Sequence, residues 1–491
     1  MENKEAPKSD FALRLTSPKH VPFKFEVNIR EANKSDFFGH HLEITGRDPV
    51  TGLRKTCCYS LADKAHSAYL DFYEKLAQDF GLRLPQNRGP QKKNFTAKIA
   101  YQEVLTQNLA PGILYGYGDP AVLRVQGNSD EDVWYYLLVT SNDAPNSFPI
   151  LRSRNLTDWK LVNFVFPAGQ KPVWAADGEL VSDYWAPEMH QVKDEFWVYF
   201  VARDKHSREL CIGMAKAARP VGPFIPEEEP ILRGNIIDPH VFVQEDGMAY
   251  LYWKEDNNDV WPGELIDLLA AKPDLIPALF AKPEDQITVS FILTVWPWAR
   301  VLEPMERFQV IQVFIEAVIT RYLDFYNQLS SLLEKQPASV QAHIRRVRQF
   351  MKTPMFAQLL SADGKQLVGN KTKILENDLE WEAHVVEGMW VTQQESKYYL
   401  FYAGNDFSTD QYGIGVAIAD SPLGPYQKRP KPFLQSTAEW WAPGHPSVAR
   451  GPEGKQILFL HAYYPGQAGY KQFRALLAVP LKFEKNQVLV D

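Results

Sequence analysis

Three acidic residues, Asp119, Asp238 and Glu387, each stand where a run of strand-forming residues begins. Asp119 is followed by Pro-Ala-Val-Leu-Arg-Val, Asp238 by Pro-His-Val-Phe-Val and Glu387 by Gly-Met-Trp-Val. Proline lacks an N–H and is tolerated at the first residue of a strand, so Asp-Pro marks the start of a strand. We therefore expect the three carboxyl groups at one rim of a β-structure, where they could act as general acid and general base.

The elements that must position these acids follow a repeated order of strand, polar turn and aromatic strand. The pairs of predicted strands are 121–125 with 133–139, 187–192 with 196–201, 240–244 with 248–253, 387–391 with 397–402, and 446–450 with 457–462. One small sheet repeated at a period of about 40 to 50 residues is typical of a β-propeller. We predict a mainly β fold with a five-bladed β-propeller. A β-sandwich is the alternative, but its strands would not repeat this order five times.

Four further motifs accompany the acids: Tyr-Trp-Ala-Pro-Glu at 184–188, Tyr-Gly-Ile-Gly-Val-Ala at 412–417, Ser-Pro-Leu-Gly-Pro-Tyr at 421–426 and Pro-Gly-His-Pro-Ser at 443–447. In this order and spacing, the motifs and acids resemble glycoside hydrolase family 43, whose members are five-bladed propellers with an Asp base, a second Asp and a Glu acid. The resemblance covers about residues 110–491, apart from one insertion. It implies that Asp119 is the base, that Asp238 raises the pKa of the acid and orients it, and that Glu387 is the acid.

The chemistry of glycoside hydrolysis explains why several carboxyl groups are needed. An inverting enzyme protonates the leaving oxygen with one carboxyl and activates water with another, roughly 6.5 to 9.5 Å away. Glu387 must stay protonated near neutral pH, which requires burial or a nearby negative charge such as that of Asp238. Taken singly, each acid also fits an ordinary turn or strand end. Of the neighbouring acids, we expect Glu188 to serve the blade architecture and Glu382 to be solvated.

Sugar sites also need flat apolar surfaces and polar groups that bind hydroxyls. Trp185 and Trp390 are the candidate stacking residues because both belong to motifs beside the expected cavity, and Asn142 is a weaker polar candidate. Family resemblance places His445 near the propeller axis, where some relatives hold a histidine beside the water around a calcium ion. A neutral imidazole is a poor calcium ligand compared with oxygen. We therefore assign His445 to the substrate pocket and assign no metal or other cofactor.

The predicted third blade is interrupted by a long segment, residues 260–353, that lacks strand alternation. Its apolar residues recur every three or four positions, as in helices: Phe314, Val318, Tyr322, Phe325 and Leu329. The most apolar stretch, 287–299, is shorter than the about 20 residues of a membrane span. We predict a helical insertion at the active rim. It could be a lid, a wall that restricts the site to chain ends, a subunit contact or a plain surface decoration.

The first 109 residues lie outside the resemblance. They contain a strand-like stretch at 23–29, a helical stretch at 61–80 and a Pro- and Gly-containing segment at 85–93 that reads as a linker. We predict a small α+β module. These residues show no evident aromatic platform for binding carbohydrate. A role in supporting the propeller is therefore an equally good interpretation.

Composition sets limits on partners and compartment. The 491 residues are 45% hydrophobic with a net charge of −7 and no basic stripe, which argues against nucleic acid as a partner. The first ten residues lack the apolar core of a secretory signal, and three cysteines are an odd and small number. We therefore expect reduced thiols, no metal site and a cytoplasmic location.

The sequence thus predicts an exo-acting, inverting glycosidase that removes α-L-arabinofuranosyl or β-xylosyl units from oligosaccharides or glycosides. The choice of sugar rests on the family resemblance. Two alternatives stay open, a non-catalytic glycan-binding propeller and an endo-arabinanase.

Overall fold

The computed structural model describes residues 13–31, 39–61, 65–88, 95, 99–127, 129, 132–258 and 260–491. The chain forms two compact units. The first, Met1–Pro90 with Asp259–Gln349, is called the α+β unit below. The second, Gln91–Asn258 with Phe350–Asp491, is called the β unit.

Within the described residues, the β unit contains five antiparallel sheets. The first contains β6 (Ala121–Gln126), β7 (Val133–Leu138), β8 (Ser147–Ser153) and β9 (Lys160–Phe166). The second contains β10 (Trp185–Val192), β11 (Glu195–Arg203), β12 (Leu210–Ala217) and β13 (Ile225–Pro226). The third contains β14 (Ile236–Val243), β15 (Ala249–Glu255), β16 (Met355–Leu360) and β17 (Leu367–Leu375). The fourth contains β18 (Val386–Gln394), β19 (Lys397–Gly404), β20 (Gly413–Ala419) and β21 (Gln427–Lys428). The fifth contains β22 (Trp441–Arg450), β23 (Gln456–Tyr463), β24 (Ala475–Glu484) and β25 (Gln487–Val490), and β5 (Gln102–Leu105) also pairs with β24.

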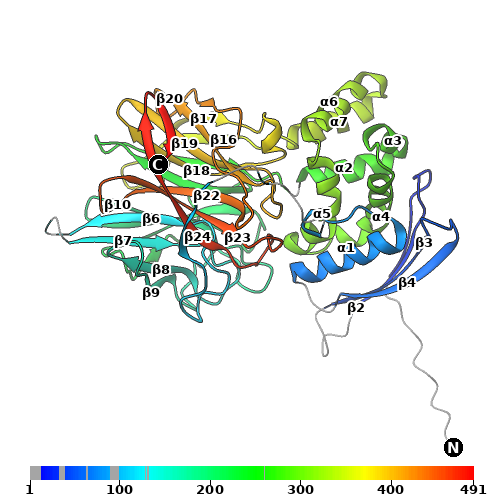
Figure 1. Ribbon diagram of the computed structural model, residues 1–491, viewed down its shortest axis with the longest axis horizontal. Helices are drawn as coiled ribbons and strands as arrows, with labels where there is room; N and C mark the ends of the chain where they lie inside the picture. Colours follow the sequence, from blue (N-terminus) through cyan, green and yellow to red (C-terminus); the bar gives the residue numbers. More distant parts are fainter. Residues whose placement is uncertain are drawn as a thin grey trace, which may run out of the picture. The chain divides into compact units, whose positions relative to one another are not determined.

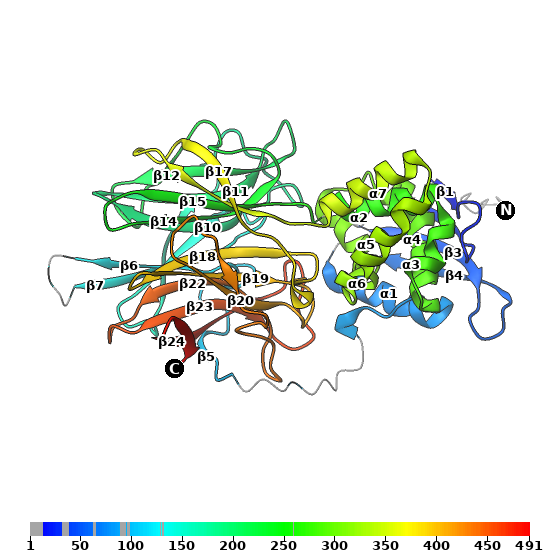
Figure 2. The same ribbon diagram turned by 90° about the horizontal axis from the view of Figure 1, so that it is seen from above.

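The first strands of the five sheets follow one another around a common centre. Strand β6 contacts β10, β10 contacts β14, β14 contacts β18, β18 contacts β22, and β22 contacts β6 again. Figure 2 labels all five of these strands in the β unit. Residues at the starts of these strands are thereby brought together from distant parts of the sequence.

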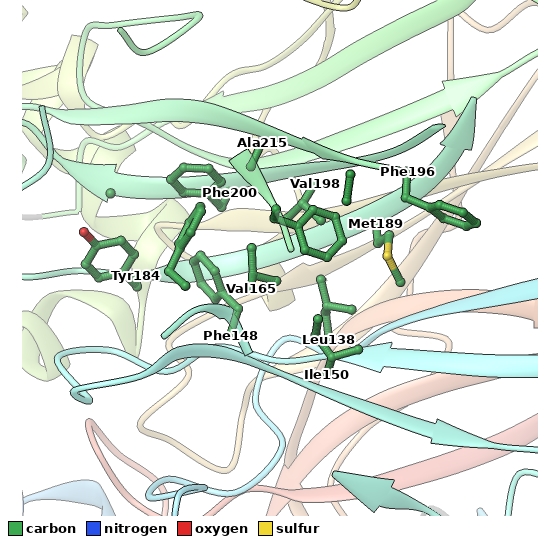
Figure 3. Close-up of a cluster of buried hydrophobic side chains, with 14 of the residues drawn as sticks. Leu138, Phe148, Ile150, Val165, Tyr184, Met189, Phe196, Val198, Phe200 and Ala215 are labelled. Atoms are coloured by element: carbon green, nitrogen blue, oxygen red, sulfur yellow. The ribbon is translucent and has the colours of Figure 1, made fainter. Parts of the chain in front are cut away.

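Apolar side chains fill the spaces between neighbouring sheets. Between the first and second sheets, Leu138, Phe148 and Ile150 pack against Met189 and Phe200, as Figure 3 shows. Equivalent clusters lie between the second and third, third and fourth, fourth and fifth, and fifth and first sheets. The alternation of strand residues gives each sheet two apolar faces, so each sheet is buried from both sides.

The five predicted strand pairs are present as the hairpins β6–β7, β10–β11, β14–β15, β18–β19 and β22–β23. The prediction that each Asp-Pro begins a strand holds for Asp119, which precedes β6, and is wrong for Asp238. Asp238 and Pro239 lie inside β14, where the register shifts between Ile237 and His240. A bulge tolerates proline because the extra residue makes no ladder hydrogen bond.

The chain leaves the third sheet after β15 and returns at β16. The helices in between are α2 (Val260–Ala271), η2 (Pro273–Leu275), α3 (Ile276–Leu279), α4 (Pro283–Ala299), α5 (Pro304–Ile319), α6 (Tyr322–Leu332), η3 (Leu333–Lys335) and α7 (Ala338–Phe350). The predicted helical spacing from Phe314 to Leu329 is divided between α5 and α6 by a break at Thr320 and Arg321. All five of the apolar residues that carried that spacing are buried.

The N-terminal segment of the α+β unit forms one sheet and one helix. The sheet has the order β1 (Leu13–Thr16), β2 (Glu26–Glu31), β3 (His40–Arg47) and β4 (Arg54–Leu61), followed by α1 (His66–Phe80) and η1 (Gln86–Arg88). Figure 1 shows α1 alongside the helices of the later segment. Arg83 pairs with Asp285 at 2.9 Å, and Tyr73 donates a hydrogen bond to the carbonyl of Val310. The two segments, predicted as separate modules, therefore share one interior.

Part of the predicted linker at 85–93 forms η1, and residues 89–93 lie outside the described residues. Residues 102–105 fall within the predicted N-terminal module, 1–109, but in the structure they form β5 and pair with β24 of the β unit. The short run Gln-Glu-Val-Leu carries too weak a pattern to show this distant pairing. No helix in the described part of the chain is long and apolar enough to cross a membrane, and the apolar α4 is instead buried among other helices.

Candidate active site

Asp119 lies at the start of β6 in a left-handed backbone conformation, with φ of 53°. Arg474 donates a hydrogen bond of 2.8 Å to its Oδ1, and Thr140 donates one of 2.5 Å to its Oδ2. The backbone N–H of Asp119 donates to Nδ1 of His461 at 3.1 Å. A side chain at Gly118 would collide with the guanidinium of Arg474, so glycine is required for this approach. Asp119 is thus held by groups from three different parts of the chain.

Asp238 and Glu387 face the same centre from β14 and β18. Asp238 also has a left-handed backbone conformation, with φ of 58°, and its Oδ2 accepts a hydrogen bond of 2.7 Å from the N–H of Gly388. That bond joins Asp238 to the residue that follows Glu387. The strained backbone at these positions is typical of functional sites, where the surrounding structure fixes an unusual conformation.

The carboxyl group of Glu387 has two direct partners. Tyr412 donates a hydrogen bond of 2.7 Å to Oε1, and the ammonium of Lys254 lies 3.4 Å from Oε2. The Lys254 side chain is 0% exposed. A lysine is almost never fully buried unless it is paired, so the pairing with Glu387 and its neighbours accounts for this position.

The environments of Asp119 and Glu387 push their protonation in opposite directions. Burial opposes ionisation of Asp119, but Arg474 and His445 outweigh it and hold its pKa well below the ordinary value. Burial raises the pKa of Glu387 to about 7, and the negative charge of Asp238 adds to this, while Lys254 opposes it. One carboxyl is therefore kept ionised and the other is kept able to carry a proton near neutral pH.

The pKa of Asp238 is also raised to about 7, first by burial and then by the charge of Asp119, against the effect of Lys254. Asp238 and Glu387 therefore compete for a proton and titrate as a coupled pair. The charge of one carboxyl disfavours ionisation of the other, so near neutral pH the pair retains a proton that can be transferred.

The structure brings His445 into this group. Its Nδ1 lies 3.4 Å from Oδ1 of Asp119, and its ring packs against the backbone at Gly388. Asn142 and Trp185 contact each other, because the indole N–H of Trp185 donates to Oδ1 of Asn142 at 2.9 Å. Trp185 is partly exposed, whereas Asn142 is buried.

Trp390 lies in a second cluster, around a buried carboxylate. Its ring packs against the rings of His240, with centroids 4.7 Å apart, and His190, at 6.4 Å. Both histidines hydrogen-bond to Oε2 of Glu188 at 2.9 Å. Nε2 of His240 accepts from the N–H of Val391. Glu188 thus joins β10 to β14, and His240 extends the cluster to β18 through Val391.

A family model for glycosyl hydrolases family 43 matches residues 111–272 and 344–489, which is more than half of the chain. The chain belongs to this family. Members are glycosidases, and the fold of the family is the β-propeller. The match covers all three acids and runs from both sides into the helical segment, whose central part it omits.

Two curated relatives and one solved structure are similar to the chain. It is 42% identical over 81 residues to Xylosidase/arabinosidase 43A of Humicola insolens, covering 16% of this chain and 23% of that protein. It is 24% identical over 292 residues to the Xylosidase/arabinosidase of Bacteroides ovatus, covering 60% of this chain and 68% of that protein. A crystal structure of a thermostable family-43 glycoside hydrolase shares the fold, with a TM-score of 0.52, 23% identity, and coverage of 79% of this chain and 96% of that one.

Several residues of this family 43 site are not predicted from the sequence. Lys254 follows the aromatic run at 248–253, and His461 interrupts the apolar run at 457–462. A polar residue within a buried strand is the sequence signal that could identify both residues. Arg474 and Thr140 gave no such signal, because their importance depends on contacts with a distant Asp119.

The prediction that Glu382 is solvated is wrong. Glu382 is 0% exposed and accepts hydrogen bonds from the N–H groups of Asp378 and Leu379 and from the hydroxyl of Tyr402. The ammonium of Lys428 also lies 2.8 Å away. Glu382 therefore anchors the turn that leads into β18 and Glu387.

The surroundings of His445 do not fit a calcium ion. Calcium takes six to eight oxygen ligands, but the carboxylate nearest to His445 is that of Asp119, whose oxygens already accept from Arg474 and Thr140. No group of three or more His, Cys, Asp or Glu side chains that could hold a metal occurs among the residues that the structure describes.

Proposed function

We propose that this family 43 protein is an exo-acting, inverting glycosidase that removes α-L-arabinofuranosyl or β-xylosyl units from oligosaccharides or glycosides. Asp119 is the general base, Glu387 the general acid and Asp238 the residue that adjusts the acid. The observation that carries the proposal is the opposite shift of pKa at Asp119 and Glu387 within one site.

In the proposed reaction, Glu387 gives its proton to the glycosidic oxygen as the bond to the sugar breaks. Asp119 takes a proton from a water molecule that attacks the opposite face of the sugar. The hydrogen bond from Gly388 to Asp238 fixes the backbone beside the acid. Arg474 and Thr140 fix the base. The site then has a base that is ionised and an acid that is protonated before substrate arrives, and no cofactor is required.

We infer that the five sheets are five blades of one closed propeller and that residues 260–353 are an insertion in the third blade. The ring of contacts from β6 through β22 and back to β6 supports the first inference. The departure of the chain between the paired strands β15 and β16 supports the second.

The exo mode is supported by where the insertion begins. Asn258, close to its start, accepts a hydrogen bond from Lys254, which also contacts Glu387. The chain thus leaves the third sheet beside the residue that contacts the acid. The choice of pentose is supported by the names of the similar proteins, which include xylosidase and arabinosidase.

Hydrolysis of aryl α-L-arabinofuranosides and aryl β-xylosides, with good and poor leaving groups, tests the proposal. Wild type is expected to cleave one series with inversion, seen by NMR of the first-formed anomer. Glu387→Gln is expected to lose activity mainly on substrates with poor leaving groups, which need protonation. Asp119→Asn is expected to lose activity on substrates with good and with poor leaving groups. Retention of the anomeric configuration contradicts the inverting mechanism.

Labelled linear oligosaccharides test the mode of cutting. Release of single sugars from one end supports the exo mode, and predominant cutting in mid-chain supports the endo-arabinanase alternative. Equal sugar binding by wild type and both variants, with no turnover of any pentoside, establishes the non-catalytic glycan-binding alternative.

We also propose that the protein works in the reducing environment of the cytoplasm. The support is that Cys57, Cys58 and Cys211 are free thiols. Fractionation of the source cells, with the protein detected by antibody, tests this location, and recovery from the extracellular fraction contradicts it.

A further inference from the structure

Lys254 is a buried cation with three oxygen partners. Its Nζ lies 3.4 Å from Glu387, 3.6 Å from Asp256 and 3.3 Å from Oδ1 of Asn258. Because the side chain is 0% exposed, it cannot act by touching a substrate in solvent-accessible space. Its contacts instead join Glu387 to the segment that leads out of β15.

The chain both leaves and re-enters the β unit beside Glu387. On the outgoing side, the N–H of Asp256 donates to the carbonyl of Asn235, and the side chain of Asn257 donates to the carbonyl of Lys352. On the returning side, the N–H of Thr353 donates to Asn377 at 2.9 Å. We call residues 255–258 and 350–354 together the junction.

The returning half of the junction also reaches the acid. Oγ1 of Thr353 accepts a hydrogen bond of 3.2 Å from the N–H of Val386, the residue before Glu387. Asn377 binds the carbonyl groups of Met351 and Ala383 and so ties the junction to the turn that precedes β18. Glu387 is therefore held from two sides, through its carboxylate by Lys254 and through its backbone neighbour by Thr353.

We propose that Lys254 is a positioning residue that fixes the carboxyl group of Glu387 for proton donation and links it to the junction of the helical insertion. This role rests on the proposed function, in which Glu387 is the acid. An ammonium at this distance favours the ionised carboxyl, so Lys254 offsets part of the effect of burial and of Asp238. The proton of Glu387 then leaves at a pH close to neutral instead of being retained.

Several titratable groups act on or respond to Lys254, and His384, whose pKa is lowered first by burial, is also affected by the charge of Lys254. Asp238 and Asp256 act on it together with Glu387 and keep the ammonium protonated despite burial. A displacement of Asn258 would move Nζ relative to Glu387. The outgoing half of the junction thus helps to set the position of Nζ beside Glu387.

Four variants test the proposal. Lys254→Met removes the charge with little change of volume, Lys254→Arg keeps it, and Asn258→Ala removes the anchor in the junction. Lys373→Met is the matched control, since Lys373 lies in the same sheet and its side chain is 54% exposed. Thermal unfolding checks that each variant folds.

The first readout is the titration of the Glu387 carboxyl by ¹³C NMR, with the signal assigned by its loss in Glu387→Gln. Lys254→Met is expected to raise the pKa of Glu387 by at least about one pH unit. Asn258→Ala is expected to raise it less, because Nζ loses one of its three oxygen partners and keeps Glu387 and Asp256. Lys254→Arg and Lys373→Met are expected to leave it near the wild-type value.

The second readout is the pH dependence of kcat on aryl glycosides, whose alkaline limb should shift upward in Lys254→Met with KM unchanged. An unchanged titration in Lys254→Met overturns the positioning role, and an unchanged titration in Asn258→Ala overturns the link to the junction. Absence of wild-type turnover counts against the proposed function alone, because the NMR titration still decides the role of Lys254.

Discussion

The hydroxyl of Tyr412 donates a hydrogen bond of 2.7 Å to the carboxyl oxygen Oε1 of Glu387. This bond favours the ionised form of Glu387. Tyr412→Phe is therefore expected to raise the pKa of Glu387, and the alkaline limb of the pH–rate profile should move up by about one pH unit. Profiles of kcat for wild type and variant on a poor leaving group measure this shift. A downward shift would contradict the role of the bond.

Asp238→Asn is expected to shift the same limb the other way. The negative charge of Asp238 raises the pKa of Glu387, so its removal lowers that pKa and the acid loses its proton at lower pH. The amide oxygen of Asn can still accept from Gly388, which makes this a change of charge with little change of shape. Opposite shifts in Tyr412→Phe and Asp238→Asn, measured in one buffer series, separate the two effects.

The wild-type pH profile should be asymmetric. Since the pKa of Asp119 is held well below its ordinary value, the base stays ionised far into the acidic range. Since the pKa values of Asp238 and Glu387 are raised to about 7, activity is expected to fall as the pH rises above about 7. The profile of kcat/KM reports these groups in the free enzyme. Full activity at pH 9 would show that Glu387 is not the proton donor.

Gly388→Ala is expected to lose both activity and stability. Gly388 has φ of 57°, and a Cβ there would lie 2.9 Å from Nδ1 of His445. Gly369→Ala is the matched control, because Gly369 has φ of 75° and open space around the added methyl group. The control should lose only about 1 to 2 kcal/mol for the left-handed conformation and keep its activity. Equal losses of activity and stability in both variants would show that the contact with His445 is not the cause.

Glu382→Ala is expected to destabilise the β unit by about 3 to 5 kcal/mol, because the N–H groups of Asp378 and Leu379 and the hydroxyl of Tyr402 lose their buried acceptor. Glu380→Ala, an exposed acid in the same short helix (η4, Glu380–Glu382), should change stability by no more than about 0.5 kcal/mol. Urea denaturation followed by tryptophan fluorescence compares the two. A similar midpoint for both variants would show that the buried network contributes little.

The sequence was most informative where a local pattern carries the structure. Alternation and turn residues predicted the hairpins, and the order of the motifs predicted which hairpins Asp119, Asp238 and Glu387 accompany. The partners of these acids were less accessible, since Lys254 and Arg474 act across sheets that are distant in sequence. The burial of Glu382 was also not predicted, because it depends on contacts with Lys428 and Tyr402 from later strands.

The pairing of β5 with β24 has a consequence for how the chain folds. Leu105 pairs with Leu476, and β5 and β25 lie along the same edge of β24. During synthesis the segment with Leu105 emerges from the ribosome long before β24 exists, so it must wait unpaired while four sheets are made. Contacts of such long sequence separation form slowly. Closure of this sheet is therefore expected to be the last step of folding, and truncation of the final strands should leave the early segment exposed to proteases.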